Sequence, residues 1–175
     1  MIKLNAKELR TISVDAEAAK SVKRNPITII LDNVLDTYNV GSIFRLADAV
    51  AAEKVILCGA TLTPPNSRIK KASINTTGWV TWEYAESTFN AVQKLKSEGV
   101  KIVAVEQDAR SKPFYQVKYE FPLAIVVGNE TYGVSKEVLD ESDMIVEMPM
   151  WGVNKSLNVM VSCGIILYEI MKQAV

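Results

Sequence analysis

Three short motifs contain the residue types that could do chemistry, and each one follows an apolar run. They are Asn39-x-Gly41-x-x-x-Arg45, then Gly128-Asn129-Glu130-x-x-Gly133, and finally Met148-Pro149-Met150-x-Gly152 leading to Ser156-Leu157-Asn158. Together they supply a guanidinium, a carboxylate, a hydroxyl and several carboxamides. The last two motifs end buried strands, and open α/β sheets bind their ligands at that edge. We therefore expect the site there.

The residues that are missing also limit the chemistry. The sequence contains no histidine, which removes the commonest general base near neutral pH and any imidazole metal site. Cys58 and Cys163 lie in apolar segments without metal-type spacing, so we expect buried thiols in a reducing compartment and no metal. Any reaction must then depend on arginine, lysine, carboxylates, hydroxyls or positioning.

Each motif alone also has an ordinary structural explanation. Asn39 stands where a helix N-cap belongs, and Arg45 could form a weak surface pair with Asp48. Ser156 could cap the last helix, and Asn158 could be a buried amide satisfied by the backbone. All three motifs in this order, each after a strand, favour a functional explanation.

The elements that must position these motifs alternate between strand and helix. Apolar runs predict strands at 27–31, 55–58, 101–105 and 123–127 and one ending at 148–150, while helical spacing predicts helices at 40–50, 87–98 and 157–171, with a short helix after Gly133. Residues 61–71 read as a Pro-rich loop and 108–120 as a polar connection. This alternation predicts an α/β fold, an open parallel sheet with helices on both faces.

The chain length suits one domain with a short appendage. We expect residues 1–25 to be a short N-terminal helical extension, with its helix at 15–23, and residues 26–175 to be the main domain. The start lacks the apolar core of a signal peptide, and the longest apolar stretch, 157–171, is too short to span a bilayer. These features predict a soluble cytoplasmic protein without a membrane partner.

The charge of the whole chain does not attract nucleic acid. Lysine plus arginine and aspartate plus glutamate both number 20, so an RNA partner would need a local basic patch. Arg68, Lys70 and Lys71 form the best candidate, with Trp79 and Trp82 nearby. Cations for phosphates and rings for bases are typical of single-stranded RNA surfaces, although such runs are more often solvated loops.

The three motifs together closely resemble those of the SpoU-type (TrmH-like) members of the SPOUT methyltransferases. The resemblance extends from Pro26 to the end of the chain, although the segment from Lys70 to Gly78 is only loosely similar. It implies an RNA ribose 2′-O-methyltransferase that uses S-adenosylmethionine and acts on tRNA or rRNA. It also implies that the C-terminal part of the sheet forms a deep trefoil knot, which no sequence pattern could indicate.

The resemblance also assigns roles to residues. It implies catalytic roles for Arg45, Asn39, Glu130, Ser156 and Asn158, with Arg45 also contacting the RNA phosphate. It implies that the cofactor is held by Val127, Gly128, Asn129, Gly133, Val146, Met148, Gly152, Ser156 and Leu157. Because arginine is almost never deprotonated in proteins, stabilisation of a nascent alkoxide by Arg45 is at least as plausible as base catalysis.

In such proteins two subunits pair around the last helix and share the active site. Here the helix at 157–171 is apolar nearly all round, so a homodimer through it is expected, and a charge at Ile166 should dissociate or unfold the dimer. The alternative is a central helix buried within the monomer.

Two other functions remain open. A catalytically idle RNA-binding or assembly protein could keep the fold, and an enzyme could keep the cofactor but methylate another acceptor. The intact motifs argue against the idle protein, while the zero net charge leaves room for another acceptor.

Overall fold

The structure is a computed structural model, and it describes residue 19 and residues 21–174. Most of the helix predicted at 15–23 and most of the extension predicted at 1–25 lie outside the described residues. Both therefore stay predictions, as does the boundary between extension and domain.

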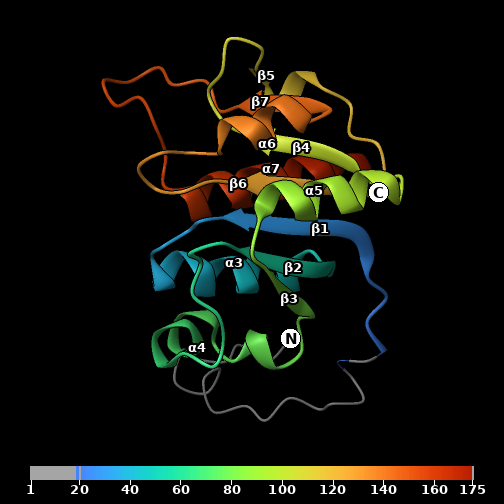
Figure 1. The fold of residues 1–175 in the computed structure, drawn as a ribbon, viewed down its shortest axis with the longest axis vertical. Coiled ribbons are helices and arrows are strands. Elements are labelled where there is room, and N and C mark those ends of the chain that lie inside the picture. The colour runs from blue at the N-terminus through green and yellow to red at the C-terminus, as the bar shows by residue number, and fades with distance from the viewer. Residues whose placement is uncertain (1–18, 20, 175) are drawn as a thin grey trace.

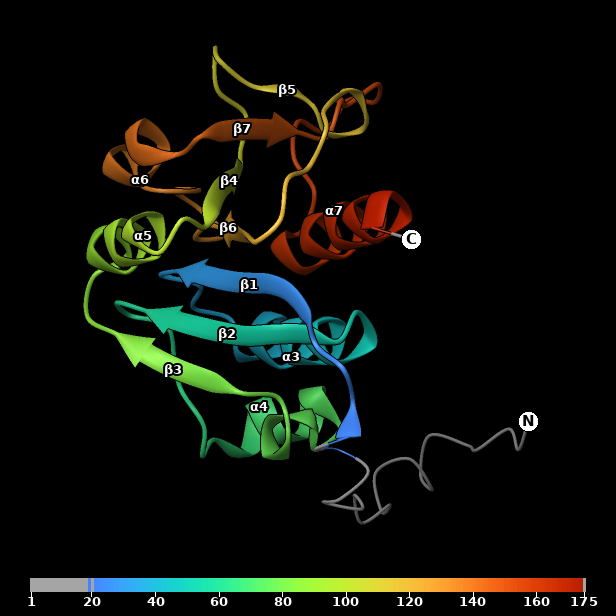
Figure 2. The same ribbon diagram turned by 90° about the vertical axis from the view of Figure 1, so that its right-hand side faces the viewer.

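Among the described residues, one sheet of seven parallel strands forms the centre of the fold. Figures 1 and 2 show this sheet from two directions. Its spatial order is β3-β2-β1-β6-β4-β7-β5. The strands are β1 (Asn25–Asp32), β2 (Ala52–Cys58), β3 (Trp82–Ala85), β4 (Lys101–Val105), β5 (Lys112–Pro113), β6 (Leu123–Val127) and β7 (Met144–Glu147). The predicted open parallel sheet is thus confirmed.

Helices cover both faces of this sheet, as predicted. In Figure 2, α3 and α7 lie on one face and α5 and α6 on the other. The helical segments are α3 (Thr37–Ala49), α4 (Ser67–Ser73), η1 (Thr76–Gly78), α5 (Thr88–Ser97), η2 (Phe114–Gln116), α6 (Lys136–Glu141) and α7 (Val159–Ala174).

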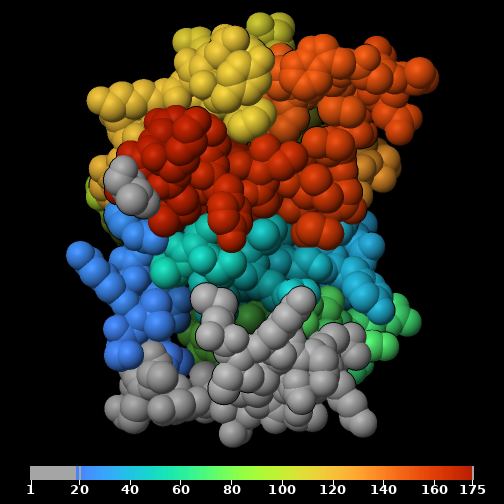
Figure 3. All heavy atoms as spheres, turned by 180° about the vertical axis from the view of Figure 1, so that it is seen from behind, coloured from blue at the N-terminus to red at the C-terminus, as the bar shows by residue number. Residues whose placement is uncertain are grey.

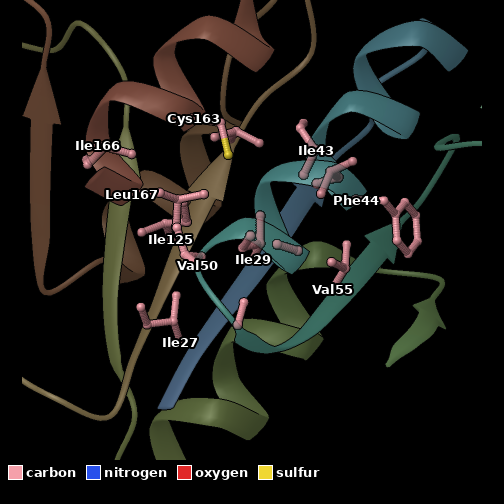
Figure 4. Close-up of a cluster of buried hydrophobic side chains, with 14 of the residues drawn as sticks. Ile27, Ile29, Ile43, Phe44, Val50, Val55, Ile125, Cys163, Ile166 and Leu167 are labelled. Carbon is pink, nitrogen blue, oxygen red and sulfur yellow. The ribbon is translucent and has the colours of Figure 1, made fainter. Parts of the chain in front are cut away.

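Strand side chains alternate between two apolar cores, one on each face. On β1, Ile29 and Leu31 face the core beneath α3 and α7, while Ile30 faces the core beneath α5 and α6. Figure 4 shows the first core, where Ile43 of α3 and Leu167 of α7 close over the strands. Burial on both faces explains why the central strands read as continuous apolar runs.

Residues 61–71 were predicted to be a loop, and this is wrong for the second half of the segment. There α4 begins after Asn66, whose side-chain oxygen accepts from the backbone amides of Arg68 and Ile69 at 2.9 and 3.2 Å. Ile69 is completely buried and anchors α4 against α3. The polar connection predicted at 108–120 likewise contains β5 and η2.

Two further expectations concern the cysteines and the membrane. Cys58 and Cys163 are free and buried, as predicted, and burial raises the pKa of each thiol to about 12. Across residues 21–174, no helix is both long and apolar enough to cross a membrane.

Candidate active site

A cavity of about 430 Å³ opens at the carboxyl ends of β4, β6 and β7. Its wall combines apolar and polar residues from four separate segments of the chain. They are Val105, Glu106, Gln107, Val127, Gly128, Asn129, Glu130, Thr131, Gly133, Glu147, Met148, Met150, Ser156, Leu157, Asn158, Val159 and Ser162. The cavity lies at the sheet edge where parallel α/β proteins bind ligands.

The second motif forms a tight hairpin on one side of this cavity. The backbones of Asn129 and Gly133 exchange two hydrogen bonds of 3.0 and 2.9 Å. The Asn129 side chain accepts from the amides of Thr131 and Tyr132 at 2.9 and 3.1 Å, which stabilises the turn. Gly133 has a φ of +70°, and a β-carbon on Gly128 would collide with the Gly133 backbone. Both glycines are therefore structural requirements of the hairpin.

Glu130 projects from this hairpin to the start of α3. One carboxylate oxygen accepts from the Leu35 amide at 3.0 Å, and the other from the Asp36 amide at 3.0 Å and from Asn39 Nδ2 at 2.9 Å. Partial burial by itself would raise the pKa of Glu130, but these donors outweigh it and the pKa is lowered. The carboxylate thus joins the hairpin to α3 in its ionised form.

Asn39 continues this connection to the third motif. Its side-chain oxygen accepts from Asn158 Nδ2 at 3.1 Å, and Asn39 itself is 4% exposed. Glu130, Asn39 and Asn158 therefore form one hydrogen-bonded chain across three segments. The sequence placed these three residues in one site, and the structure brings them into contact.

The predicted caps at these positions are wrong. The N-cap of α3 is Asp36, which accepts from the Tyr38 amide at 2.7 Å, so Asn39 is free to bond across the site. Asn158, not Ser156, accepts from the Met160 amide at the start of α7, at 2.9 Å. Asn158 is exposed, so it is not the buried amide that the structural explanation assumed, although its side chain does bond to the backbone at the start of α7.

Arg45 stands apart from the cavity. It lies on the exposed side of α3, does not line the cavity, and has no ion-pair partner among the described residues. The surface pair with Asp48 is not formed, and Asp48 accepts instead from Trp79 Nε1 at 2.7 Å. Within this chain, the structure does not bring Arg45 together with the other predicted catalytic residues.

The predicted cofactor contacts divide into two groups. Seven of them line the cavity: Val127, Gly128, Asn129, Gly133, Met148, Ser156 and Leu157. The other two do not. Val146 is completely buried in the apolar core, and Gly152 lies in an exposed loop with open space where a β-carbon would stand.

Sequence reasoning missed Glu106 and Gln107, which follow β4. Glu106 Oε2 accepts from the Val134 amide at 2.9 Å, and the Gln107 side chain donates to the Lys155 carbonyl. Each residue thus holds one of the two loops around the cavity. Their only sequence signal was their position after the strand predicted at 101–105.

The predicted RNA patch lies elsewhere, on α4. Arg68, Lys70 and Lys71 are all exposed there, and none lines the cavity. Trp79 and Trp82 are partly buried and pack against the core, so these rings are engaged within the fold. The cations are available to a polyanion, but the proposed partnership with these two rings is not supported.

The cavity has the properties that S-adenosylmethionine requires. Its volume falls within the usual range for small-molecule sites. Val105, Val127, Met148 and Leu157 give it an apolar wall, while backbone and polar side chains of the two loops converge on it. Gly128 and Gly133 of the hairpin both line the cavity.

The chain is similar to known RNA methyltransferases. The sequence model of the SpoU rRNA Methylase family matches residues 26–168. The chain is 38% identical over 157 residues to the tRNA (guanosine(18)-2′-O)-methyltransferase of Aquifex aeolicus (strain VF5), covering 86% of this chain and 71% of that protein. It is 32% identical over 171 residues to the 23S rRNA (guanosine-2′-O-)-methyltransferase RlmB of Haemophilus influenzae, covering 96% and 68%.

The fold is also similar to that of a solved methyltransferase structure. The AdoMet-bound rRNA methyltransferase from Sinorhizobium meliloti superposes with a TM-score of 0.81 at 27% identity, over 95% of this chain and 60% of that one. The chain spans about two thirds of the length of the curated relatives it matches.

Proposed function

The chain belongs to the SpoU rRNA Methylase family, and on that premise we propose that it methylates the 2′-hydroxyl of a ribose in tRNA or rRNA, with S-adenosylmethionine as methyl donor. The observation that carries the proposal is the hydrogen-bonded chain of Glu130, Asn39 and Asn158 beside the cavity. It connects all three motifs at one place, where the sheet edge offers a ligand site.

The cofactor contacts come from the two loops of the cavity wall. Gly128 and Gly133 bring the hairpin backbone close to the ligand, and Met148 and Leu157 supply apolar contact. When bound, S-adenosylmethionine supplies a methyl group already activated on its sulfonium. The protein mainly has to align donor and acceptor, and such alignment can lower a barrier by about 7–11 kcal/mol in favourable cases.

The hydrogen-bonded chain provides the alignment of the acceptor. Glu130 fixes the start of α3 through two backbone amides, and Asn39 transmits that position to Asn158 at the cavity. Asn158 and Ser156, which both line the cavity, orient the ribose and leave its hydroxyl directed at the methyl group. Both side chains are exposed, so they are accessible to an RNA substrate.

Arg45 acts in the cavity of a second subunit. Its guanidinium holds the RNA phosphate bidentately and stabilises the alkoxide that develops on the attacking oxygen. Two observations support action across subunits: Arg45 does not line the cavity of its own chain, and it lies on α3 directly beside α7. Figure 3 displays α3 and α7 side by side on one face.

The second subunit packs on α7. This helix buries Cys163, Ile166, Leu167 and Ile170 against the sheet, while its outer face exposes three further apolar residues: Val161 at 40%, Ile165 at 36% and Tyr168 at 59%. Residues 161, 165 and 168 share one side of the helix, and an exposed apolar stripe on a helix is typical of an interface. A homodimer through α7 covers it.

The C-terminal part of the fold is a deep trefoil knot, as in the family that the motifs resemble. The strand order supports this proposal, because β6 inserts between β1 and β4, and β7 continues on the far side of β4. The chain then passes the loop at residues 148–158 and returns as α7 to pack against α3. The cytoplasm, where tRNA and rRNA reside, is the proposed location.

RNA from cells with and without the protein tests the function. Mapping of 2′-O-methylated riboses across tRNA and rRNA should identify one or a few positions that lose the methyl group in the absence of the protein. Reintroduction of the wild-type chain should restore them. Unchanged ribose methylation at every position in both RNA classes would contradict the proposal.

A further inference from the structure

Glu106 lines the cavity, but neither the motifs nor the proposed mechanism gives it a role. It follows β4, and the backbone fixes its carboxylate on both oxygens. Oε1 accepts from the Gln107 amide at 2.8 Å, and Oε2 accepts from the Val134 amide at 2.9 Å. A carboxylate has about four acceptor positions, so capacity remains for a ligand.

The charged residues that line the cavity are all negative. Glu106, Glu130 and Glu147 line the cavity, and its described lining contains no lysine or arginine. Glu130 is committed to three donors at the start of α3. Glu106 and Glu147 therefore give the cavity a negative field that no cation of the lining offsets. Such a field is felt strongly by a bound ligand, because water no longer screens it fully.

The two forms of the cofactor differ in charge by one unit. Both carry an ammonium and a carboxylate, but only the methyl donor also carries a sulfonium. Methyl transfer to a hydroxyl forms a carbon–oxygen bond, breaks the carbon–sulfur bond, releases the hydroxyl proton and leaves a neutral thioether. The ligand thereby loses its net positive charge within the cavity.

We propose that Glu106, assisted by Glu147 in the same wall, is a specificity-determining residue that favours the sulfonium form of the cofactor over the demethylated product. This inference rests on the proposed function, because it takes S-adenosylmethionine as the ligand of the cavity. The negative field therefore stabilises bound S-adenosylmethionine, and it stabilises the product less once the methyl group has been transferred.

The test is calorimetric titration of the full chain with S-adenosylmethionine and, separately, with S-adenosylhomocysteine. Glu106→Gln keeps an acceptor oxygen at this position and removes the charge. Its affinity for S-adenosylmethionine should fall about tenfold, while its affinity for S-adenosylhomocysteine should change less than about threefold. An analogue with an ammonium group in place of the sulfonium should lose affinity for Glu106→Gln by about as much as S-adenosylmethionine does.

Glu98→Gln is the matched control. Glu98 is exposed, caps the end of α5 and lies before β4, at the opposite edge of the sheet from the cavity. Glu98→Gln removes the same charge far from the cavity, so the affinities for S-adenosylmethionine and S-adenosylhomocysteine should both stay at their wild-type values. Glu147→Gln should also lower the ratio of the affinity for S-adenosylmethionine to the affinity for S-adenosylhomocysteine. If Glu106→Gln does not fold, Glu147→Gln alone tests the proposal.

The outcomes separate this inference from the proposed function. Failure of the wild-type chain to bind either compound would overturn both. Binding of both compounds with an unchanged affinity ratio in the variants would overturn the inference alone. An equal loss of both affinities in Glu106→Gln would also overturn it, because Glu106 would then act only by holding the hairpin through Val134.

Discussion

Asn39 Nδ2 lies 2.9 Å from Glu130 Oε1, although 91 residues separate the two in the sequence. The same Asn39 accepts from Asn158 through its other side-chain atom, so a single carboxamide connects the first motif with the second and third. An amide suits this position because it offers a donor to a carboxylate and an acceptor to another amide.

Replacement of Asn39 by alanine should therefore weaken the cofactor site as well as the fold. Loss of the amide leaves Glu130 and Asn158 each without one partner. Because both of these side chains are exposed and water can replace the lost partner, the free energy of unfolding should fall by about 0.5–1.5 kcal/mol, the net contribution of a typical hydrogen bond. Asn39→Asp should be worse, because it places a second carboxylate against Glu130. Urea unfolding and titration with S-adenosylmethionine measure both effects. Asn90→Ala, on the exposed face of α5, is the control and should change neither.

Acidification should reveal the contribution of Glu130. Its pKa is lowered in the folded chain, so the unfolded chain binds more protons between the folded and unfolded pKa values. The stabilisation is thus fully present above the unfolded pKa of about 4.3 and is lost as the pH falls through the folded pKa. The stability gap between wild type and Glu130→Gln should be largest near neutral pH and shrink in acid. A gap that grows in acid would contradict the assigned hydrogen bonds.

Adjacent positions on α7 test the proposed dimer. Ile165 is 36% exposed and Ile166 is completely buried. Light scattering of the wild type should give twice 19.3 kDa. Ile165→Glu should give a folded monomer, whereas Ile166→Glu should unfold the chain, because a buried unpaired charge costs several kcal/mol.

The different burial of Ile165 and Ile166 changes which substitution tests the dimer. A charge at Ile166 was expected to report on the dimer, but that side chain belongs to the core of the monomer (Figure 4). A monodisperse wild-type monomer at micromolar concentration would refute the dimer.

Arg45 should be essential for methyl transfer and dispensable for folding. It is exposed and makes no ion pair with a described residue, so Arg45→Ala should keep the unfolding curve and the cofactor affinity of the wild type. Methyl transfer should fall by about 10²–10³, the usual effect of removing one charge-stabilising donor. Arg45→Lys should restore little, because a point charge cannot replace the bidentate fork.

Mixed dimers decide where Arg45 acts. A heterodimer of one Arg45→Ala subunit and one Asn158→Ala subunit has one intact site if Arg45 serves the partner, and none if it serves its own chain. We expect about half of the wild-type activity from the purified heterodimer. Activity no higher than in either parent would contradict action across subunits.

Much of the fold was accessible from the sequence, for a physical reason. The strands at 101–105 and 123–127 were predicted with their observed bounds, because burial on both faces makes them uninterrupted apolar runs. The helix α4 was missed, since Pro64 and Pro65 mark a loop while the cap at Asn66 depends on local geometry.

The site was accessible only in part. Motif spacing grouped Asn39, Glu130 and Asn158, but it could not tell that Asp36 caps α3 and releases Asn39 for the site. Glu106 and Gln107 gave no signal, because their role arises from the loops that the sheet brings beside them. Contacts between segments so far apart in the chain are set by topology, which local periodicity does not encode.

Transfer of a methyl group to a ribose 2′-hydroxyl of RNA can be measured directly. The most direct measurement incubates the purified wild-type chain with S-adenosylmethionine labelled in its methyl group and unmodified tRNA and rRNA transcripts. The RNA is then digested in alkali and with a 2′-hydroxyl-dependent ribonuclease. Label should appear in a dinucleotide that resists cleavage, because the methylated 2′-oxygen can no longer attack the phosphate. Label confined to mononucleotides, as from base methylation, or no label in either RNA despite bound cofactor, would contradict it.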